Sequence, residues 1–250
     1  MQEATPAMPA EAPPPERSPD HGAIPGAGGG PLSDPRALQI LSTEHWSLLA
    51  TRSLAYNEAF SRAGMFLSFL SASLIVIGFL VGAQASSSAI LPVVFVLLLA
   101  DLYIGVATVG RLLGASAEEL QCVRGMNRIR HAYGEMVPGL EPYFVSGFHD
   151  DAHGVLATYG YDARPGLIGN ILHGLTTTIG MVGTIDAMIV GALGAVIAIG
   201  LGGGLVAALL LAVTGFLVGF GSFAVIGQRS AVGGQARAES RFPTPVVPDP

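Results

Sequence analysis

The chain has 250 residues, of which 50% are hydrophobic and only 12% are charged, against roughly 25% charged residues in an average soluble domain. This composition excludes an ordinary soluble domain and predicts an integral membrane protein. The chain has 12 arginines and no lysine, which excludes enzymes whose chemistry depends on a lysine. The net charge of -6 argues against nucleic-acid binding, and the single cysteine cannot form an internal disulfide.

The first 34 residues are rich in proline and glycine and carry mostly acidic charges. They contain too few large apolar side chains to offset the entropy lost on ordering, so we expect residues 1–34 to be a disordered acidic tail. We expect the same of the C-terminal tail, residues 228–250.

A helix is predicted between the N-terminal tail and the first apolar region. Apolar and small residues recur there at alternating spacings of three and four, and Glu58 and Arg62 form an i,i+4 pair. This pattern predicts a helix that begins near Ser42 and runs directly into the first membrane span.

Two long charge-free runs, residues 63–100 and 187–228, define the membrane region. As a straight helix the first would be ~57 Å long, nearly twice the hydrocarbon thickness of about 30 Å, so each run must fold back on itself. Turn residues lie at 82–88 and at 202–204. We therefore predict an all-α fold with four transmembrane helices in two hairpins. Residues 35–110 contain the cytoplasmic helix and the first hairpin, and residues 176–227 form the second hairpin.

The segment between the hairpins, residues 111–175, is predicted to be helical and cytoplasmic. Ser116 to Glu119 has the form of a capping box, a second helix is expected over 120–137, and a short one over 150–159. Arginines occur in this segment and in both flanking segments, but not in the hairpin turns. By the positive-inside rule, both termini are predicted to be cytoplasmic and the protein to lie in the inner membrane.

Small residues line one face of three of the predicted spans. Such faces allow close helix packing in lipid, and we expect them to pack within the four-helix unit, with a homo-oligomer interface as the alternative. These residues are Gly64, Ser68, Ser71 and Gly78 in span one, Gly183, Ala187, Gly191 and Ala195 in span three, and Gly215 and Gly219 in span four.

Asp101 and Asp186 are the two acidic residues predicted to lie near the bilayer midplane. No basic residue is expected at that depth, so at least one carboxyl should be protonated, or the two should share a proton or a cation. We expect neutral carboxyls hydrogen-bonded between helices. The alternative is a proton or cation pathway.

A polar cluster between the hairpins contains His149, Asp150, Asp151 and His153. Histidines at i,i+4 can bind a transition metal from one helical face. A third ligand cannot be identified, however, so we expect a helix start in which the carboxylates meet the positive end of the helix dipole.

Several segments resemble a group of uncharacterised bacterial four-span integral membrane proteins. The similarity covers about residues 38–228 and includes Tyr56 to Met65, Gly125 to Tyr133, Glu141 to Phe144 and His149 to Asp151. The resemblance implies architecture and transfers no activity or site. A looser analogy of layout exists with two-helix membrane effectors of bacterial nucleotide-signalling defence systems.

These observations predict a non-enzymatic membrane protein without a cofactor that acts as a scaffold, a sensor or an oligomeric assembly. The expected partners are the lipid bilayer and further copies of the chain. The alternative is a small proton- or cation-conducting channel or carrier that uses Asp101 and Asp186. A metal-dependent membrane enzyme ranks last, since only the histidine cluster supports it.

Overall fold

The computed structural model describes residues 30–83, 86–160, 174–236 and 239–245, and every regular element in these ranges is helical. The all-α prediction is confirmed. The long helices are α1 (Ala37–Gly82), α2 (Ser87–Met136), α5 (Thr178–Gly200) and α6 (Leu205–Ala236). The short ones are η1 (Pro31–Ser33), η2 (Glu141–Tyr143) and α3 (Ala152–Thr158). Most of the predicted N-terminal tail, and residues 161–173 of the predicted cytoplasmic segment, lie outside the described residues.

The four long helices form two antiparallel hairpins, and each is long and apolar enough to cross a membrane. Helices satisfy every backbone hydrogen bond internally, which the hydrocarbon interior requires. The second hairpin turns over residues 201–204, where Gly202 has a φ of 80° that favours glycine. The chain is therefore a multi-pass helical membrane protein with the two hairpins expected from the charge-free runs.

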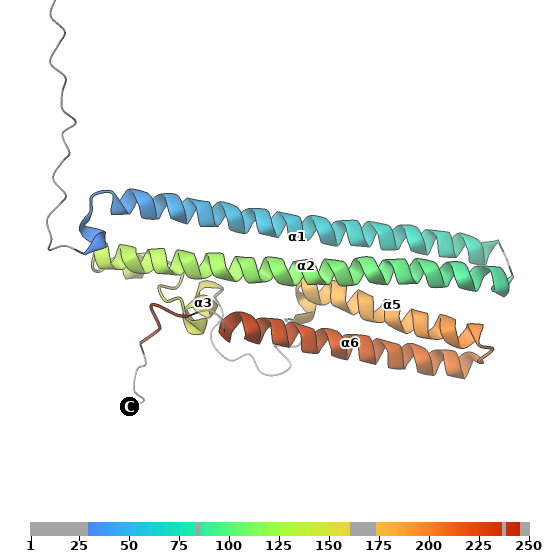
Figure 1. Cartoon of the computed structure of the whole chain (residues 1–250). Helices are drawn as coiled ribbons and strands as arrows, with labels where there is room; N and C mark the ends of the chain where they lie inside the picture. Colours follow the sequence, from blue (N-terminus) through green and yellow to red (C-terminus); the bar gives the residue numbers. More distant parts are fainter. Residues whose placement is uncertain (1–29, 84–85, 161–173, 237–238, 246–250) are drawn as a thin grey trace, which may run out of the picture.

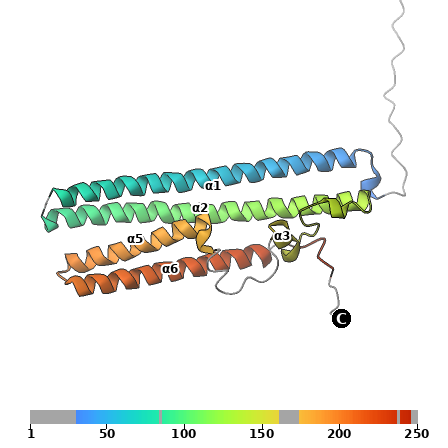
Figure 2. The same cartoon turned by 180° about the vertical axis from the view of Figure 1, so that it is seen from behind.

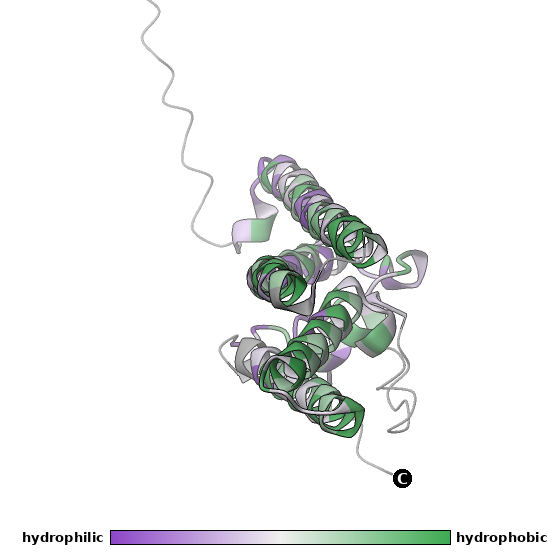
Figure 3. Ribbon diagram, turned by 90° about the vertical axis from the view of Figure 1, so that its right-hand side faces the viewer, coloured by the Kyte–Doolittle hydropathy of each residue, from purple (hydrophilic) through white to green (hydrophobic). Residues whose placement is uncertain are grey.

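The helices are stacked in the order α1, α2, α5, α6 (Figures 1 and 3). The main contacts join α1 to α2, α2 to α5, and α5 to α6. Consequently α1 and α6 are the two edges of the stack, and α2 lies in its interior. Large apolar side chains of α6 are exposed, as expected for a surface that faces lipid, including Leu209, Leu210, Val213, Leu217 and Val218.

Helices α1 and α2 extend well past α5 at the end where α3 lies (Figures 1 and 2). We call this the arginine-rich end, and the opposite one, with Ala83, Ser86 and residues 201–204, the hairpin end. Glu58 forms ion pairs of 3.0 Å with Arg62 and with Arg111 of α2. These guanidinium groups lower the pKa of Glu58 to about 2. Arg52 likewise pairs with Glu119 at 2.9 Å, so ion pairs tie α1 to α2 beyond the apolar region.

Two boundaries differ from the sequence prediction. Helix α1 begins at Ala37 rather than near Ser42, and Ser116 starts no helix because α2 is continuous through it. Leu112 and Ala115 are buried on the inner face of α2, so packing continues the helix where the local capping pattern predicted a new start. The chain after residue 228 also differs from the predicted tail, since α6 continues to Ala236 and residues 239–245 are described.

The small residues of α5 and α6 lie in the contact between these two helices. A Cβ on Gly191 would be 2.7 Å from the carbonyl oxygen of Ala212, and one on Gly215 would be 2.9 Å from that of Val190. A Cβ on Gly219 would be 3.1 Å from the Cα of Ala187. Gly183 faces the ring of Phe223, and Ala195 is half-buried. Close approach of the two backbones therefore depends on these residues.

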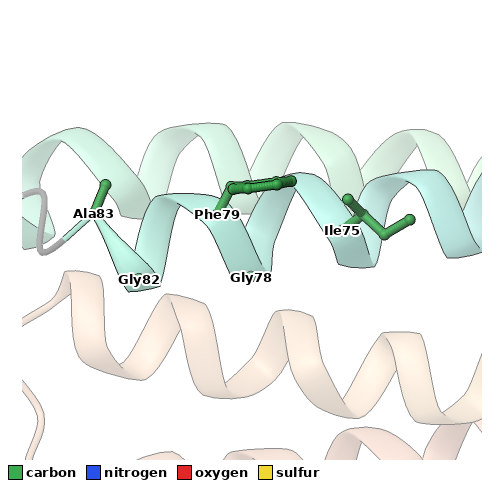
Figure 4. A pocket seen from close by; sticks show the side chains of 5 residues that line it. All are labelled: Ile75, Gly78, Phe79, Gly82 and Ala83. Carbon is green, nitrogen blue, oxygen red and sulfur yellow. The ribbon is translucent and has the colours of Figure 1, made fainter.

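The small-residue face of α1 is open instead. A Cβ on Gly64, Gly78 or Gly82 would meet nothing within 4 Å. Ser68 and Ser71 are exposed and donate their hydroxyls to carbonyl groups of α1 itself. Near the hairpin end, this face borders an apolar hollow of about 500 Å³ (Figure 4), lined by Ile75, Gly78, Phe79, Gly82 and Ala83. The packing within the unit that we expected from the sequence is thus seen for α5 and α6 but not for α1.

The α5–α6 contact predicts the effect of adding one methyl group. Gly191→Ala should lower the free energy of unfolding by about 1–3 kcal/mol, because the obstructing atom is a backbone carbonyl and the helices must move apart. Gly221→Ala on α6 is the matched control, since its Cβ would meet nothing within 4 Å. Thermal unfolding in detergent checks this, and equal melting temperatures for the two variants would contradict it.

Candidate functional site

Two buried carboxyl groups lie between the membrane helices. Asp101 of α2 is 0% exposed, and its Oδ1 accepts a hydrogen bond of 3.0 Å from the hydroxyl of Ser73 on α1. Asp186 of α5 is 7% exposed and packs against Gly105, one turn along α2 from Asp101. A Cβ on Gly105 would overlap Asp186 Oδ1. Glycine at 105 therefore makes the space in which the second carboxyl lies.

Each carboxyl has one buried oxygen without a partner. Among the described residues, Asp101 Oδ2 and Asp186 Oδ1 have no hydrogen-bond partner. Both aspartates are described, and no hydrogen bond joins them. The shared proton or cation expected from the sequence therefore stays a prediction. An ionised carboxylate with an unpaired oxygen is costly in hydrocarbon, so a proton or a small cation would stabilise each of these two oxygens.

Apolar side chains enclose this site along the helix axes. The buried cluster around it includes Val94 and Leu98 on the hairpin side of Asp101, and Phe66, Leu112 and Val182 toward the arginine-rich end. Thr108, about two turns along α2 from Asp101, donates its hydroxyl to the carbonyl of Ile104 in its own helix. In this conformation the carboxyl pair is thus an occluded site, with apolar layers on both sides.

A second site lies at the arginine-rich end, around the predicted histidine cluster. Helix α3 begins only at Ala152, and Asp151 is its N-cap, accepting a 2.9 Å hydrogen bond from the N–H of Gly154. His149 therefore precedes the helix, and His153 is exposed. The i,i+4 spacing of the two histidines does not place them on one helical face.

The adjacent Asp150 is buried rather than a surface cap, since it is only 2% exposed. It is covered by the C-terminal segment, residues 239–245, that follows α6. Asp150 Oδ1 accepts hydrogen bonds from the Ser240 hydroxyl at 2.6 Å and the Phe242 N–H at 2.8 Å. Its Oδ2 accepts from the Arg241 N–H at 3.0 Å and from the Arg128 guanidinium at 2.6 Å. One buried carboxylate thus binds three consecutive residues of the C-terminal segment.

Further contacts extend this interaction in both directions. Arg128 also donates to the Glu239 carbonyl at 3.0 Å. Asp151 accepts from the N–H and the hydroxyl of Thr244 at 3.1 and 2.8 Å. The ring of Phe242 stacks on His131 with centroids 4.3 Å apart. The turn that contains Asp150 and Asp151, which we call the acidic turn, therefore forms one polar interface with α2 and the C-terminal segment.

Hydrogen bonding also controls the charge of the two aspartates. Burial by itself would raise the pKa of Asp150, but the donors from residues 240–242 and the Arg128 guanidinium lower it below its ordinary value. Burial likewise opposes ionisation of Asp151, while the N–H of Gly154 and the two Thr244 donors lower its pKa. Both groups are carboxylates at neutral pH, and the interface weakens only when acid protonates them.

The carboxylates of the acidic turn bind the C-terminal segment. No group of three or more His, Cys, Asp or Glu that could hold a metal occurs within the described ranges. The carboxylate oxygens of Asp150 and Asp151 accept hydrogen bonds from four residues of the C-terminal segment, and also from Arg128 and from the N–H of Gly154. The four residues are Ser240, Arg241, Phe242 and Thr244.

Sequence reasoning missed the partners of both sites. Ser73 was not singled out, because nothing local distinguishes it from other small residues of a membrane helix. The contacts of Asn127, of Arg128 and of the C-terminal segment were missed because they span 22 to 111 residues of sequence. The spacing of two between Ser240, Phe242 and Thr244 is compatible with an extended segment, but it does not indicate what that segment contacts.

Comparison with protein-family models, with curated proteins and with solved structures finds no match to this chain. Function therefore has to be inferred from the geometry of the two sites.

The position of Asp186 predicts that alanine substitution at two glycines of α2 will have different effects on stability. Gly105→Ala should lower the free energy of unfolding by about 1–3 kcal/mol, because the added methyl displaces a buried carboxyl. At Gly110 a Cβ would meet nothing within 4 Å, so Gly110→Ala should be neutral or stabilising through helix propensity. Melting temperatures in detergent decide this, and a destabilised Gly110→Ala beside an unaffected Gly105→Ala would refute it.

Proposed function

We propose that the protein is a non-enzymatic scaffold or sensor of the bacterial inner membrane, with its arginine-rich end and both termini in the cytoplasm. The observation that carries the proposal is the continuity of α1 and α2, which pass without interruption from the apolar region into the arginine-rich end. At about 1.5 Å per residue, these helices are ~69 and ~75 Å long. Their paired extension joins the membrane core rigidly to a polar surface that other molecules can reach.

Two further features support a role in assembly. Helix α1 lies at an edge of the stack, with an open small-residue face along Gly64, Gly78 and Gly82. The arginine-rich end bears a preformed polar interface around Asp150. Copies of the chain in the bilayer and proteins in the cytoplasm are the partners that these surfaces suit.

The proposed topology predicts a labelling pattern. In a Cys122→Ala background, Ser86→Cys should react with a membrane-impermeant maleimide added to intact cells, because Ser86 is exposed at the hairpin end. Thr43→Cys, exposed on α1 at the arginine-rich end, should react only after the cells are opened. Labelling of Thr43→Cys in intact cells would reverse the proposed orientation.

A second candidate function is binding or transport of a proton or small cation. The observation that favours it is the pair of buried, unpaired oxygens on Asp101 and Asp186. The apolar layers on both sides mean that transport would require the helices to move, whereas binding alone would not.

Reconstitution in liposomes with a pH-sensitive dye separates the two functions. A scaffold or sensor should leave an imposed proton or cation gradient intact. Flux that is abolished by Asp101→Asn but retained by Ser71→Ala, a control on the exposed face of α1, would make the protein a carrier or channel and displace the scaffold proposal. Comparable melting temperatures of the two variants must accompany that result.

A further inference from the structure

The surface under the C-terminal segment is held in place by contacts that do not involve the segment. Asn127 of α2 is 0% exposed, and its amide donates to the carbonyls of His149 at 2.8 Å and Gly154 at 3.2 Å. Its Oδ1 accepts from Arg130 at 2.6 Å. The Asp151 cap of α3 is equally independent of the segment. These contacts hold the acidic turn against α2, so the carboxylates of Asp150 and Asp151 are positioned in advance.

The segment lies on this surface as an extended peptide. Along residues 239–245 exposure alternates strictly: Ser240, Phe242 and Thr244 are half-buried, and the residues between and beside them are exposed. Alternation with a period of two is the pattern of a strand with one face bound. The two prolines, at 243 and 245, lie at exposed positions of the segment.

Recognition of the segment relies largely on its main chain. The N–H groups of Arg241, Phe242 and Thr244 donate to Asp150 or Asp151, and the carbonyl of Phe242 accepts from the Asp150 N–H at 3.3 Å. Any extended peptide offers such groups, as in other domains that bind an added strand. Side-chain selection is confined to hydroxyls at positions 240 and 244 and to the aromatic ring at 242.

The aromatic position opens onto more space than Phe242 fills. Its ring forms one wall of a hollow of about 400 Å³ that is also lined by Arg128, Ala132, Glu135 and residues 30–33. The surface can therefore take an aromatic side chain at this position in a different rotamer or of larger size.

From these contacts we propose that this surface is a groove for an extended segment of a partner protein, with hydroxyl residues two positions before and after an aromatic residue. The chain's own residues 239–245 occupy the groove as an internal competitor. A partner must displace them, so docking is restrained until the C-terminal segment is released. The proposal deepens the scaffold function, but peptide binding in detergent is measured independently of topology and ion flux, so either can fail alone.

The test uses the full-length protein in detergent micelles and a fluorescent peptide with the sequence of residues 239–245. Its binding, followed by fluorescence anisotropy, should be weak to the wild type because the groove is occupied. In the double variant Ser240→Ala, Phe242→Ala the internal competitor is weakened. The apparent affinity for the peptide should then rise by roughly tenfold or more, as the free fraction of the groove increases.

Two controls give the result its meaning. A peptide with alanine in place of its serine and phenylalanine should bind the double variant at least about tenfold more weakly than the parent peptide does. Adding Asp150→Asn to the double variant should also weaken binding of the parent peptide, because an amide cannot accept the same set of hydrogen bonds as a carboxylate. If this triple variant does not fold, the altered peptide still provides the control.

Absence of peptide binding to the double variant would overturn the proposal, as would equal binding to the double variant and the wild type. Binding that is indifferent to the altered peptide would also overturn it. A wild-type dimer that dissociates in the double variant would identify the occupant as the C-terminal segment of a second copy and replace the partner proposed above.

Discussion

The hydrocarbon interior of the bilayer is the constraint on which the rest of this structure depends. Because lipid supplies no hydrogen-bond partners, the backbone must be helical there, and each charge-free run is too long for a single crossing. Folding each run into a hairpin brings residues 30–62, 111–160 and 239–245 to the same end of the molecule (Figure 1). The polar interface at the arginine-rich end exists only because the membrane helices first gather these distant segments.

Helix α2 connects the two sites because it contacts its hairpin partner α1, helix α5 of the other hairpin, and α3. Within the membrane it contributes Asp101 and the Gly105 gap, and at the arginine-rich end it contributes Asn127 and Arg128. The 27 residues from Asp101 to Arg128 span ~40 Å of uninterrupted helix. Pro92 lies in the second turn of α2, close to the hairpin end, so it does not break the stretch between the sites.

What the sequence could predict follows the range of the interactions involved. Hydropathy and helical spacing are patterns of neighbouring residues, so the sequence could predict the four spans, both hairpins and the Glu58–Arg62 pair. The burial of Asp150 was not, because it depends on donors about 90 residues away. The C-terminal segment was predicted to be disordered because it contains two prolines and one aromatic ring and has no core of its own. Its order comes from a surface that only the folded chain provides.

The two sites differ in how many hydrogen-bond donors their carboxyl groups receive, and this difference determines which ligand each site suits. Asp150 receives four donors and stays ionised in a buried position, whereas Asp101 receives one hydroxyl and keeps an unpaired oxygen. A fully satisfied carboxylate binds a defined polar chain and is insensitive to small changes of pH. An incompletely satisfied one in hydrocarbon is stable only when a proton or a cation completes it. Recognition of polypeptide therefore belongs to the arginine-rich end, and any response to protons or cations belongs to the contact between α2 and α5.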